Sequence, residues 1–382
     1  MASPTDILRA AFERVTRNVD IPLVTAPDIA AHIEDVSRNV VNRACTRVLL
    51  ACSLAKIHNP SLDIRKPYTE IGTPDAYAGR TYDERYVEAF IIQHKLPCNH
   101  TTAWLTPAFR NRDIILVPNT NLVGRPPHIY KATLQLLTDV YEGRITAEDL
   151  LAETLRRLII IRDEQNVRLN TWMTTLKAVA GTIPLSSEDI LTLIEQHLKS
   201  PNSSRLPVLV VAAAYDAAKG FLSERALPLE GHNAADKQTR SLGDIQITLV
   251  DDDNVVTVYE MKAKKVTQND IDIALRKVDH KIDNYIVITT EAIDEQVKTY
   301  AAGLYAKTGG IEFTVLDCIG FIRHFLHLFH RIRIKYLEAY QRLLLEEPES
   351  AVRQSLKESF LALRLASETA YSNETDEEDR IV

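Results

Sequence analysis

Apolar residues recur at helical spacing through most of the first 200 residues. One apolar face runs through residues 5–19, and similar spacing continues through 27–57. The pattern predicts further helices at about 129–142, 147–165, 169–180 and 187–199. Two capping-box patterns, Thr146-x-x-Asp149 and Ser186-x-x-Asp189, mark predicted helix starts. We therefore expect a mainly helical N-terminal domain over residues 1–200.

An aromatic and polar insert, about residues 66–113, interrupts this helical pattern. It has little periodicity, and long irregular segments inside a compact domain are often functional. Three of its arginines, Arg80, Arg85 and Arg110, are candidate DNA contacts. The aromatic residues of the insert can equally belong to the core.

The pattern changes after Pro201-Asn202-Ser203-Ser204, where helical and strand-like segments begin to alternate. Helices are predicted at 207–224, 268–280, 293–307 and 318–346, and strands at 243–250, 255–264, 284–290 and 311–316. This order predicts a mixed sheet with helices on both faces, an α/β (α+β) fold, over residues 201–366. The acidic segment 367–382 has a composition typical of disorder.

Composition narrows the class of protein. Apolar residues make up 45% of the 382 residues and charged residues 25%, which is ordinary for a globular protein. The four cysteines form no Cys-x-x-Cys pair, which favours a reducing compartment over a disulfide framework, and we expect a cytoplasmic protein. No segment has the roughly 20 apolar residues that span a bilayer. The net charge of −7 does not by itself indicate nucleic-acid binding, although a local basic groove remains compatible with it.

Three residues on two predicted strands carry the candidate chemistry. Asp244 opens one strand, and Glu260 and Lys262 lie near the end of the next. Because side chains alternate along a strand, Glu260 and Lys262 point to the same face, and a hairpin would bring Asp244 beside them. Two carboxylates can hold Mg²⁺, and a lysine can hold the attacking water or stabilise the phosphate, so the trio suits phosphodiester hydrolysis. Such a trio also occurs by chance in a chain this rich in charge.

The segments Gly243-Asp244-Ile245-Gln246-Ile247 and Val258-Tyr259-Glu260-Met261-Lys262-Ala263-Lys264 resemble the active-site hairpin of PD-(D/E)xK nucleases. More narrowly, the chain resembles the SacI family of type II restriction endonucleases, most clearly over about residues 230–275. The resemblance implies a PD-(D/E)xK nuclease core and a homodimer that cuts double-stranded DNA at a short palindrome using Mg²⁺. It also implies that Asp244 and Glu260 bind the metal and that Lys262 is the catalytic lysine. Gly243 stands where the motif has proline.

Other polar residues near the trio are candidates for DNA contact or catalysis. Glu224, at the end of the predicted helix 207–224, is a possible extra acidic residue, or else a solvated helix charge. A polar stretch leading into the first strand carries Lys237, Gln238 and Arg240, which can contact bases or phosphates. Lys264 extends the second strand and faces either phosphate or solvent.

Three hypotheses follow. The first is a type II restriction endonuclease, for which a neighbouring DNA methyltransferase gene would be the genetic partner. The second is another nuclease of this fold, such as a repair or junction-resolving enzyme, which would prefer damaged or branched DNA. The third is a non-catalytic DNA-binding α/β protein in which the trio is accidental.

Overall fold

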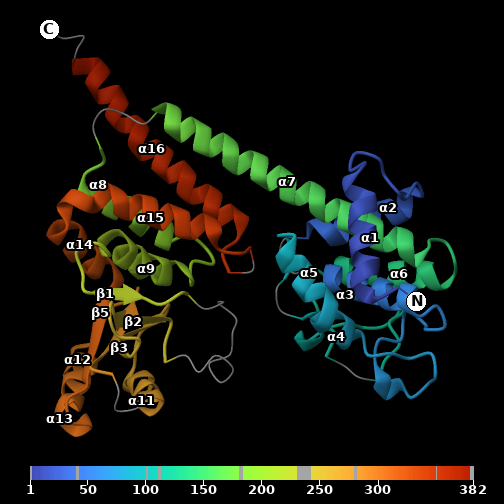
Figure 1. The fold of residues 1–382 in the computed structure, drawn as a ribbon, viewed down its shortest axis with the longest axis horizontal. Helices are drawn as coiled ribbons and strands as arrows, with labels where there is room; N and C mark the ends of the chain where they lie inside the picture. The colour runs from blue at the N-terminus through green and yellow to red at the C-terminus, as the bar shows by residue number, and fades with distance from the viewer. Residues whose placement is uncertain are drawn as a thin grey trace. The chain divides into compact units, whose positions relative to one another are not determined.

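The computed structural model describes residues 2–39, 43–99, 102–110, 113–179, 184–229, 242–278, 282–349 and 351–378. The chain divides into two compact units, Met1–Arg168 and Leu169–Val382. Figure 1 shows both units, coloured from blue to red along the chain. The boundary lies within one helix, α7 (Ala147–Val179), and so differs from the predicted linker at residue 200. The polar turn at 201–204 connects two helices of the second unit instead.

The first unit is helical, as its apolar spacing predicts. It contains α1 (Pro4–Thr16), α2 (Pro27–Arg38), α3 (Ala44–His58), α4 (Gly79–Tyr82), a π-helical turn (Asp83–Val87), α5 (Glu88–Gln93), α6 (Pro127–Tyr141) and the first part of α7. Every residue of α3 from Ala44 to Ala55 is buried, which makes α3 the centre of this unit. The apolar spacing through 27–57 belongs to two helices, α2 and α3, and not to one.

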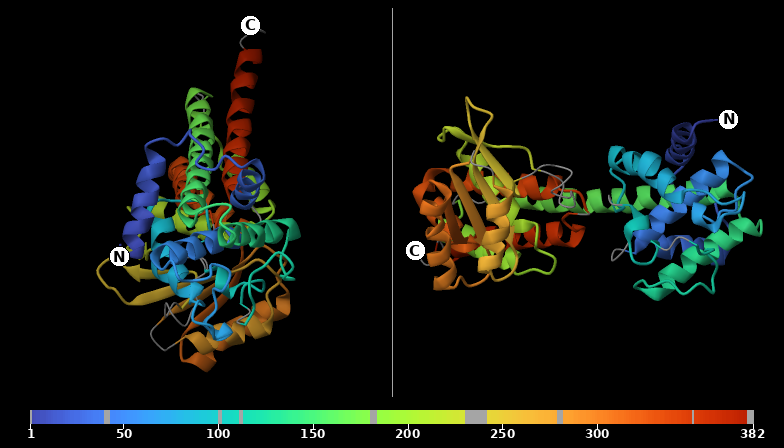
Figure 2. Two further views of the ribbon diagram at one scale, coloured as in Figure 1. Left: turned by 90° about the vertical axis from the view of Figure 1, so that its right-hand side faces the viewer. Right: turned by 90° about the horizontal axis from the view of Figure 1, so that it is seen from below.

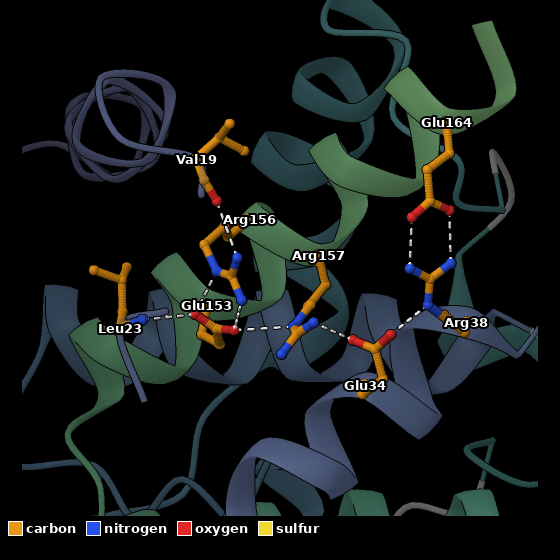
Figure 3. Close-up of polar contacts among 8 residues, drawn as sticks. All are labelled: Val19, Leu23, Glu34, Arg38, Glu153, Arg156, Arg157 and Glu164. Atoms are coloured by element: carbon orange, nitrogen blue, oxygen red, sulfur yellow. Dashed lines mark hydrogen bonds and ion pairs between the residues drawn. The ribbon is translucent and has the colours of Figure 1, made fainter. Parts of the chain in front are cut away.

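A chain of ion pairs joins α7 to α2 in the first unit (Figure 3). The buried carboxylate of Glu153 accepts hydrogen bonds from Arg156, Arg157 and the Leu23 N–H. Arg157 also pairs with Glu34 of α2. These contacts fix α7 to α2 and to the loop after α1.

The second unit is built around a five-stranded mixed sheet, which confirms the predicted α+β fold class. Its strands are β1 (Glu224–Ala226), β2 (Ile245–Leu249), β3 (Val255–Lys262), β4 (Asn284–Thr289) and β5 (Glu312–Asp317), in the order β1-β2-β3-β4-β5. The first three strands pair antiparallel, and β3, β4 and β5 pair parallel. Its helices after α7 are α8 (Ser187–Leu198), α9 (Leu206–Ala218), α11 (Gln268–Lys277), α12 (Glu295–Ala302), α13 (Leu304–Thr308), α14 (Cys318–Leu328), α15 (Arg333–Glu346) and α16 (Gln354–Glu378).

Helices cover both faces of this sheet, because side chains alternate between the faces along each strand. On one face Tyr259 and Ile286 pack in a core shared with α8, α9, α14 and α15. On the other face Val258 and Tyr285 pack in a smaller core shared with α11 and α12. Figure 1 shows α9 and α15 above the strands and α11 and α12 below them, and Figure 2 shows the sheet from a second direction. Most residues of α9 are buried, which fits a helix that is apolar on nearly all sides.

Two segments differ from the predicted boundaries. The helix predicted at 207–224 ends at Ala218, and Glu224 begins β1. The helix α16 extends to Glu378, so most of the segment 367–382 is helical where composition alone predicts disorder. The four cysteines are free and buried. Among the described residues, no helix is long and apolar enough to cross a membrane.

Candidate active site

The hairpin formed by β2 and β3 brings the three predicted residues to one place. Ile245 is paired with Tyr259, so Asp244, which precedes Ile245, lies beside the residues that follow Tyr259. The Oδ2 atom of Asp244 accepts a hydrogen bond of 2.7 Å from the backbone N–H of Met261. This bond fixes the carboxylate against the strand segment between Glu260 and Lys262.

Glu260 and Lys262 lie on the face of the sheet covered by α11. The Lys262 Nζ atom is 2.6 Å from Glu260 Oε1. The other carboxylate oxygen, Oε2, lies 3.5 Å from the Tyr285 hydroxyl and 3.9 Å from the Nζ atom of Lys277. Glu260 is therefore held by its own strand, by β4 and by the last residue of α11.

The electrostatics of the hairpin are those of two carboxylates placed close together. Burial raises the pKa of Asp244, and the negative charge of Glu260 raises it further. The Met261 N–H opposes this effect, as do the more distant charges of Arg205 and Lys262. A cation placed between Asp244 and Glu260 would relieve their repulsion and favour the ionised form of both.

These two carboxylates fit a magnesium ion. Mg²⁺ binds hard oxygen ligands and usually keeps several waters, so one or two carboxylates together with substrate phosphate are enough to hold it. In the described part of the chain no group of three or more His, Cys, Asp or Glu side chains could hold a metal ion. A magnesium ion at this hairpin would take Asp244 and Glu260 as its protein ligands.

The position before Asp244 has no room for a side chain. A Cβ atom on Gly243 would lie 2.5 Å from Val258 Cγ1 and 2.8 Å from the carbonyl oxygen of Tyr259. Both distances are shorter than normal van der Waals contacts. Gly243 stands where the motif has proline, and the close approach of β3 requires a glycine at this position in this chain.

A protein-family model matches the part of the chain that contains the hairpin. Residues 182–290 match the family model of the SacI restriction endonuclease C-terminal domain. Residues 182–290 are therefore similar to a restriction endonuclease domain, and we call them the SacI-type domain. The match spans α8 to β4 and includes all three residues of the hairpin site, and it confirms the predicted resemblance. No curated protein matches the chain. This similarity supports a nuclease that acts on DNA.

Glu224 lies elsewhere in the SacI-type domain. It pairs with Leu249, at one end of β2, whereas Asp244 lies just beyond the other end. At roughly 3.3 Å per residue, Leu249 and Asp244 are about 16 Å apart along the strand. Burial raises the pKa values of Tyr215, a residue of α9, and of Tyr259, and the charge of Glu224 adds a smaller increase to both. The structure therefore does not bring Glu224 to the carboxylate pair.

The predicted DNA contacts are distributed over both units. Lys237, Gln238 and Arg240 lie outside the described residues. The exposed Lys264 side chain pairs with Asp270 at 2.9 Å, at the start of α11. In the first unit Arg80 pairs with Glu84 at 2.7 Å, and Arg85 and Arg110 are exposed.

Sequence reasoning missed two residues of the site, Lys277 and Tyr285. Tyr285 lies on the neighbouring parallel strand β4, opposite Val258 of β3, and reaches Glu260 from there. Lys277 reaches it from the end of α11. Side chains alternate along β4, and this alternation could have placed Tyr285 on the correct face of the sheet. The sequence does not reveal where the end of a helix such as α11 lies relative to the sheet.

Proposed function

We propose that this protein is a type II restriction endonuclease that hydrolyses phosphodiester bonds of double-stranded DNA at a short specific sequence, with Mg²⁺ as cofactor. The observation that carries the proposal is the hairpin site inside the SacI-type domain. There Asp244 is fixed by the Met261 N–H, and Glu260 is paired with Lys262.

The three residues have separable roles. Asp244 and Glu260 would hold the metal, which when bound supplies an activated water and offsets charge on the phosphate. Lys262 places its ammonium group at the same edge of the sheet, where it can orient the attacking water and stabilise the anionic phosphate. Its contact with Glu260 keeps the amine in place before substrate arrives.

The remaining parts of the proposal concern partners. A palindromic target favours a homodimer with twofold symmetry, because protein symmetry then matches the symmetry of the site. Arg80, Arg85 and Arg110 of the first unit, with Lys237, Gln238, Arg240 and Lys264, would contact DNA. A DNA methyltransferase would be the genetic partner, and the protein would act in the cytoplasm.

Digestion of plasmid DNA tests this function. The purified protein is incubated with several plasmids and Mg²⁺, and the ends of the fragments are sequenced. The proposal expects discrete, reproducible fragments whose ends share one short sequence. Selective cutting of branched or damaged DNA would instead indicate a repair or junction-resolving nuclease. No cleavage with any divalent metal would contradict the enzyme assignment.

A further inference from the structure

A hollow of about 580 Å³ lies in the first unit, within the insert that interrupts the helical pattern. Its floor is apolar and aromatic, formed by Pro67, Tyr68, Trp104 and Phe109, all of which are buried. The volume falls within the range of small-molecule binding sites. The nuclease mechanism uses none of these residues.

The rim of this hollow is polar and carries two guanidinium groups. Arg80 and Arg110 both line it, and both are exposed. The Arg110 side chain makes no ion pair or hydrogen bond within the described ranges. Glu70 adds a carboxylate, and Leu105, which is 60% exposed, adds a large apolar side chain at the mouth. A ligand here would meet an apolar floor and a cationic edge.

One buried carboxylate holds two walls of the hollow together. Asp83 accepts hydrogen bonds from Arg47, from the Thr102 hydroxyl and from the Ala103 N–H. Asp83 begins the π-helical turn that directly follows α4, the helix that carries Arg80 and Thr81, and Ala103 precedes Trp104. Single π-helical turns are frequent at functional sites. Asp83 therefore connects the segment that carries Arg80 to the segment that carries Trp104.

Two further hydrogen bonds complete the frame. The Gly79 N–H donates to the carbonyl of Pro67 at 3.0 Å. The Tyr68 hydroxyl donates to the carbonyl of Phe109 at 2.9 Å, next to Arg110. The hollow is therefore preformed, because every segment that lines it is bonded to another.

Trp104, which lines the hollow, has a hydrogen-bond donor without a partner among the described residues. Trp104 is 5% exposed, and its Nε1 atom has no hydrogen-bond partner in the part of the chain that the structure covers. A buried N–H without a partner costs free energy. A ligand acceptor that reached this atom would satisfy it.

We propose that this hollow receives one nucleotide of the bound DNA, turned out of the duplex. The base would lie on the aromatic floor and accept a hydrogen bond from Trp104, and Arg80 and Arg110 would bind its phosphates. A phosphate alone would not use the apolar floor, and an apolar ligand would not use two arginines. Enzymes that read extruded bases combine such stacking with hydrogen bonds. The inference rests on the proposed function for its substrate, DNA.

Fluorescence of Trp104 tests the inference. The chain has two tryptophans, so Trp172→Phe leaves Trp104 as the single reporter in the full-length protein. This protein is titrated with each deoxynucleoside monophosphate and with inorganic phosphate. We expect saturable quenching by at least one mononucleotide and none by phosphate. The double variant Arg80→Ala/Arg110→Ala should weaken binding by at least about tenfold, because each guanidinium makes a charge-assisted contact.

The matched control is Arg9→Ala/Arg17→Ala, which removes the same charge from exposed positions in α1 and directly after it and should bind like the parent. The second arm uses duplex DNA with 2-aminopurine at each position of the sequence found by plasmid digestion, with Ca²⁺ in place of Mg²⁺. A rise in 2-aminopurine fluorescence at one position, lost in the arginine double variant, supports the inference.

Three results overturn the inference. Equal binding of inorganic phosphate would make the hollow an anion site only. Mononucleotide binding without a 2-aminopurine signal would make it a site for free nucleotides. Cleavage of plasmid by a protein whose Trp104 is never quenched would refute the nucleotide site and leave the proposed function intact. Quenching with no cleavage of any DNA would instead support nucleotide binding and refute the nuclease.

Discussion

Gly243 illustrates how single residues set the geometry of the hairpin site. The absence of a Cβ atom lets β3 approach close enough for the Met261 N–H to reach Asp244. Any side chain at residue 243 would push against the Tyr259 carbonyl, which belongs to the strand that carries Glu260 and Lys262.

We therefore expect Gly243→Ala to be damaging although the change is small. Overpacking of this kind costs about 1–3 kcal/mol of stability. The displaced strand should also reduce the rate of DNA cleavage more than it reduces DNA binding. Both are measured on the purified variant, by urea unfolding and by plasmid digestion. Gly220→Ala, where a Cβ atom would meet nothing within 4 Å, is the control. A Gly243→Ala variant with parental activity would show that the close approach is not needed.

At the residue scale the sequence predicted that the three hairpin side chains lie together, but it did not predict all of the residues that contact them. Asp244, Glu260 and Lys262 could be placed together because strand alternation and a hairpin are both readable in the sequence. Glu224 was placed wrongly, because the helix before it ends six residues earlier, at Ala218. Lys277 was missed because its approach to Glu260 depends on how α11 packs on the sheet.

At the scale of elements, most helices and strands follow from periodicity. The capping box at Ser186 is present as predicted, and Thr146 accepts a hydrogen bond from the Asp149 N–H. The separate helices predicted at 147–165 and 169–180 are one helix, α7, because nothing between them terminates it. The long helix predicted at 318–346 is interrupted by a 3₁₀ turn at His330–Ile332, which separates α14 from α15.

A buried histidine joins three helices of the second unit. The His197 side chain of α8 is fully buried, with its Nδ1 atom 2.9 Å from the Tyr340 hydroxyl and Nε2 2.9 Å from the Leu356 carbonyl. Since a carbonyl only accepts, Nε2 carries the hydrogen and the Tyr340 hydroxyl donates to Nδ1. Burial lowers the pKa of His197 from its ordinary value to about 4.

This lowered pKa predicts a pH dependence of stability. Between pH 6.5 and about 4 the unfolded chain binds a proton at His197 and the folded chain does not. The stabilisation is therefore complete above pH 6.5 and is lost as the pH falls toward 4, by about 3 kcal/mol. In a Trp104→Phe variant, Trp172 fluorescence reports the unfolding of the second unit in urea. Repeating this measurement across the pH range gives the pH dependence of its stability. His197→Gln should have a shallower slope over this range, and an equal slope would contradict the prediction.

The ion pairs of α7 provide a second prediction at this scale (Figure 3). Glu153→Ala leaves the buried guanidinium of Arg156 without its carboxylate and should destabilise the first unit by about 3–5 kcal/mol. Arg38→Ala removes exposed pairs with Glu34 and Glu164 and should cost about 1 kcal/mol or less. The two variants are compared by urea unfolding in a Trp172→Phe background, with Trp104 fluorescence as the probe. Equal losses of unfolding free energy in the two variants would mean that burial does not determine how much these ion pairs stabilise the protein.

At the scale of the whole molecule, the fold class and the SacI resemblance could be predicted, and the division into units could not. The sequence placed the boundary at a polar stretch near residue 200, because such composition is typical of linkers. The structure instead divides at Arg168, inside α7, since the C-terminal half of that helix contributes Leu176 to the core of the second unit. A boundary inside a continuous helix leaves no compositional signal.

The proposed twofold symmetry gives a prediction at this scale. A palindromic duplex should bind two copies of the chain, one for each half-site. Sedimentation equilibrium of the protein with its target duplex, in Ca²⁺, measures the mass of the complex. Two chains per duplex are expected, and one chain per duplex, with both strands still cut at the same site, would contradict the symmetric dimer.

Comparison of DNA cleavage and DNA binding by Lys262→Ala tests whether the hairpin is the catalytic site. We expect this variant to cleave target DNA at least about 100-fold more slowly than the parent in Mg²⁺, because a preorganised cation at the phosphate is lost. Its dissociation constant for the same duplex in Ca²⁺ should remain close to that of the parent. Cleavage by Lys262→Ala at the parental rate would contradict the assignment of the hairpin as the catalytic site.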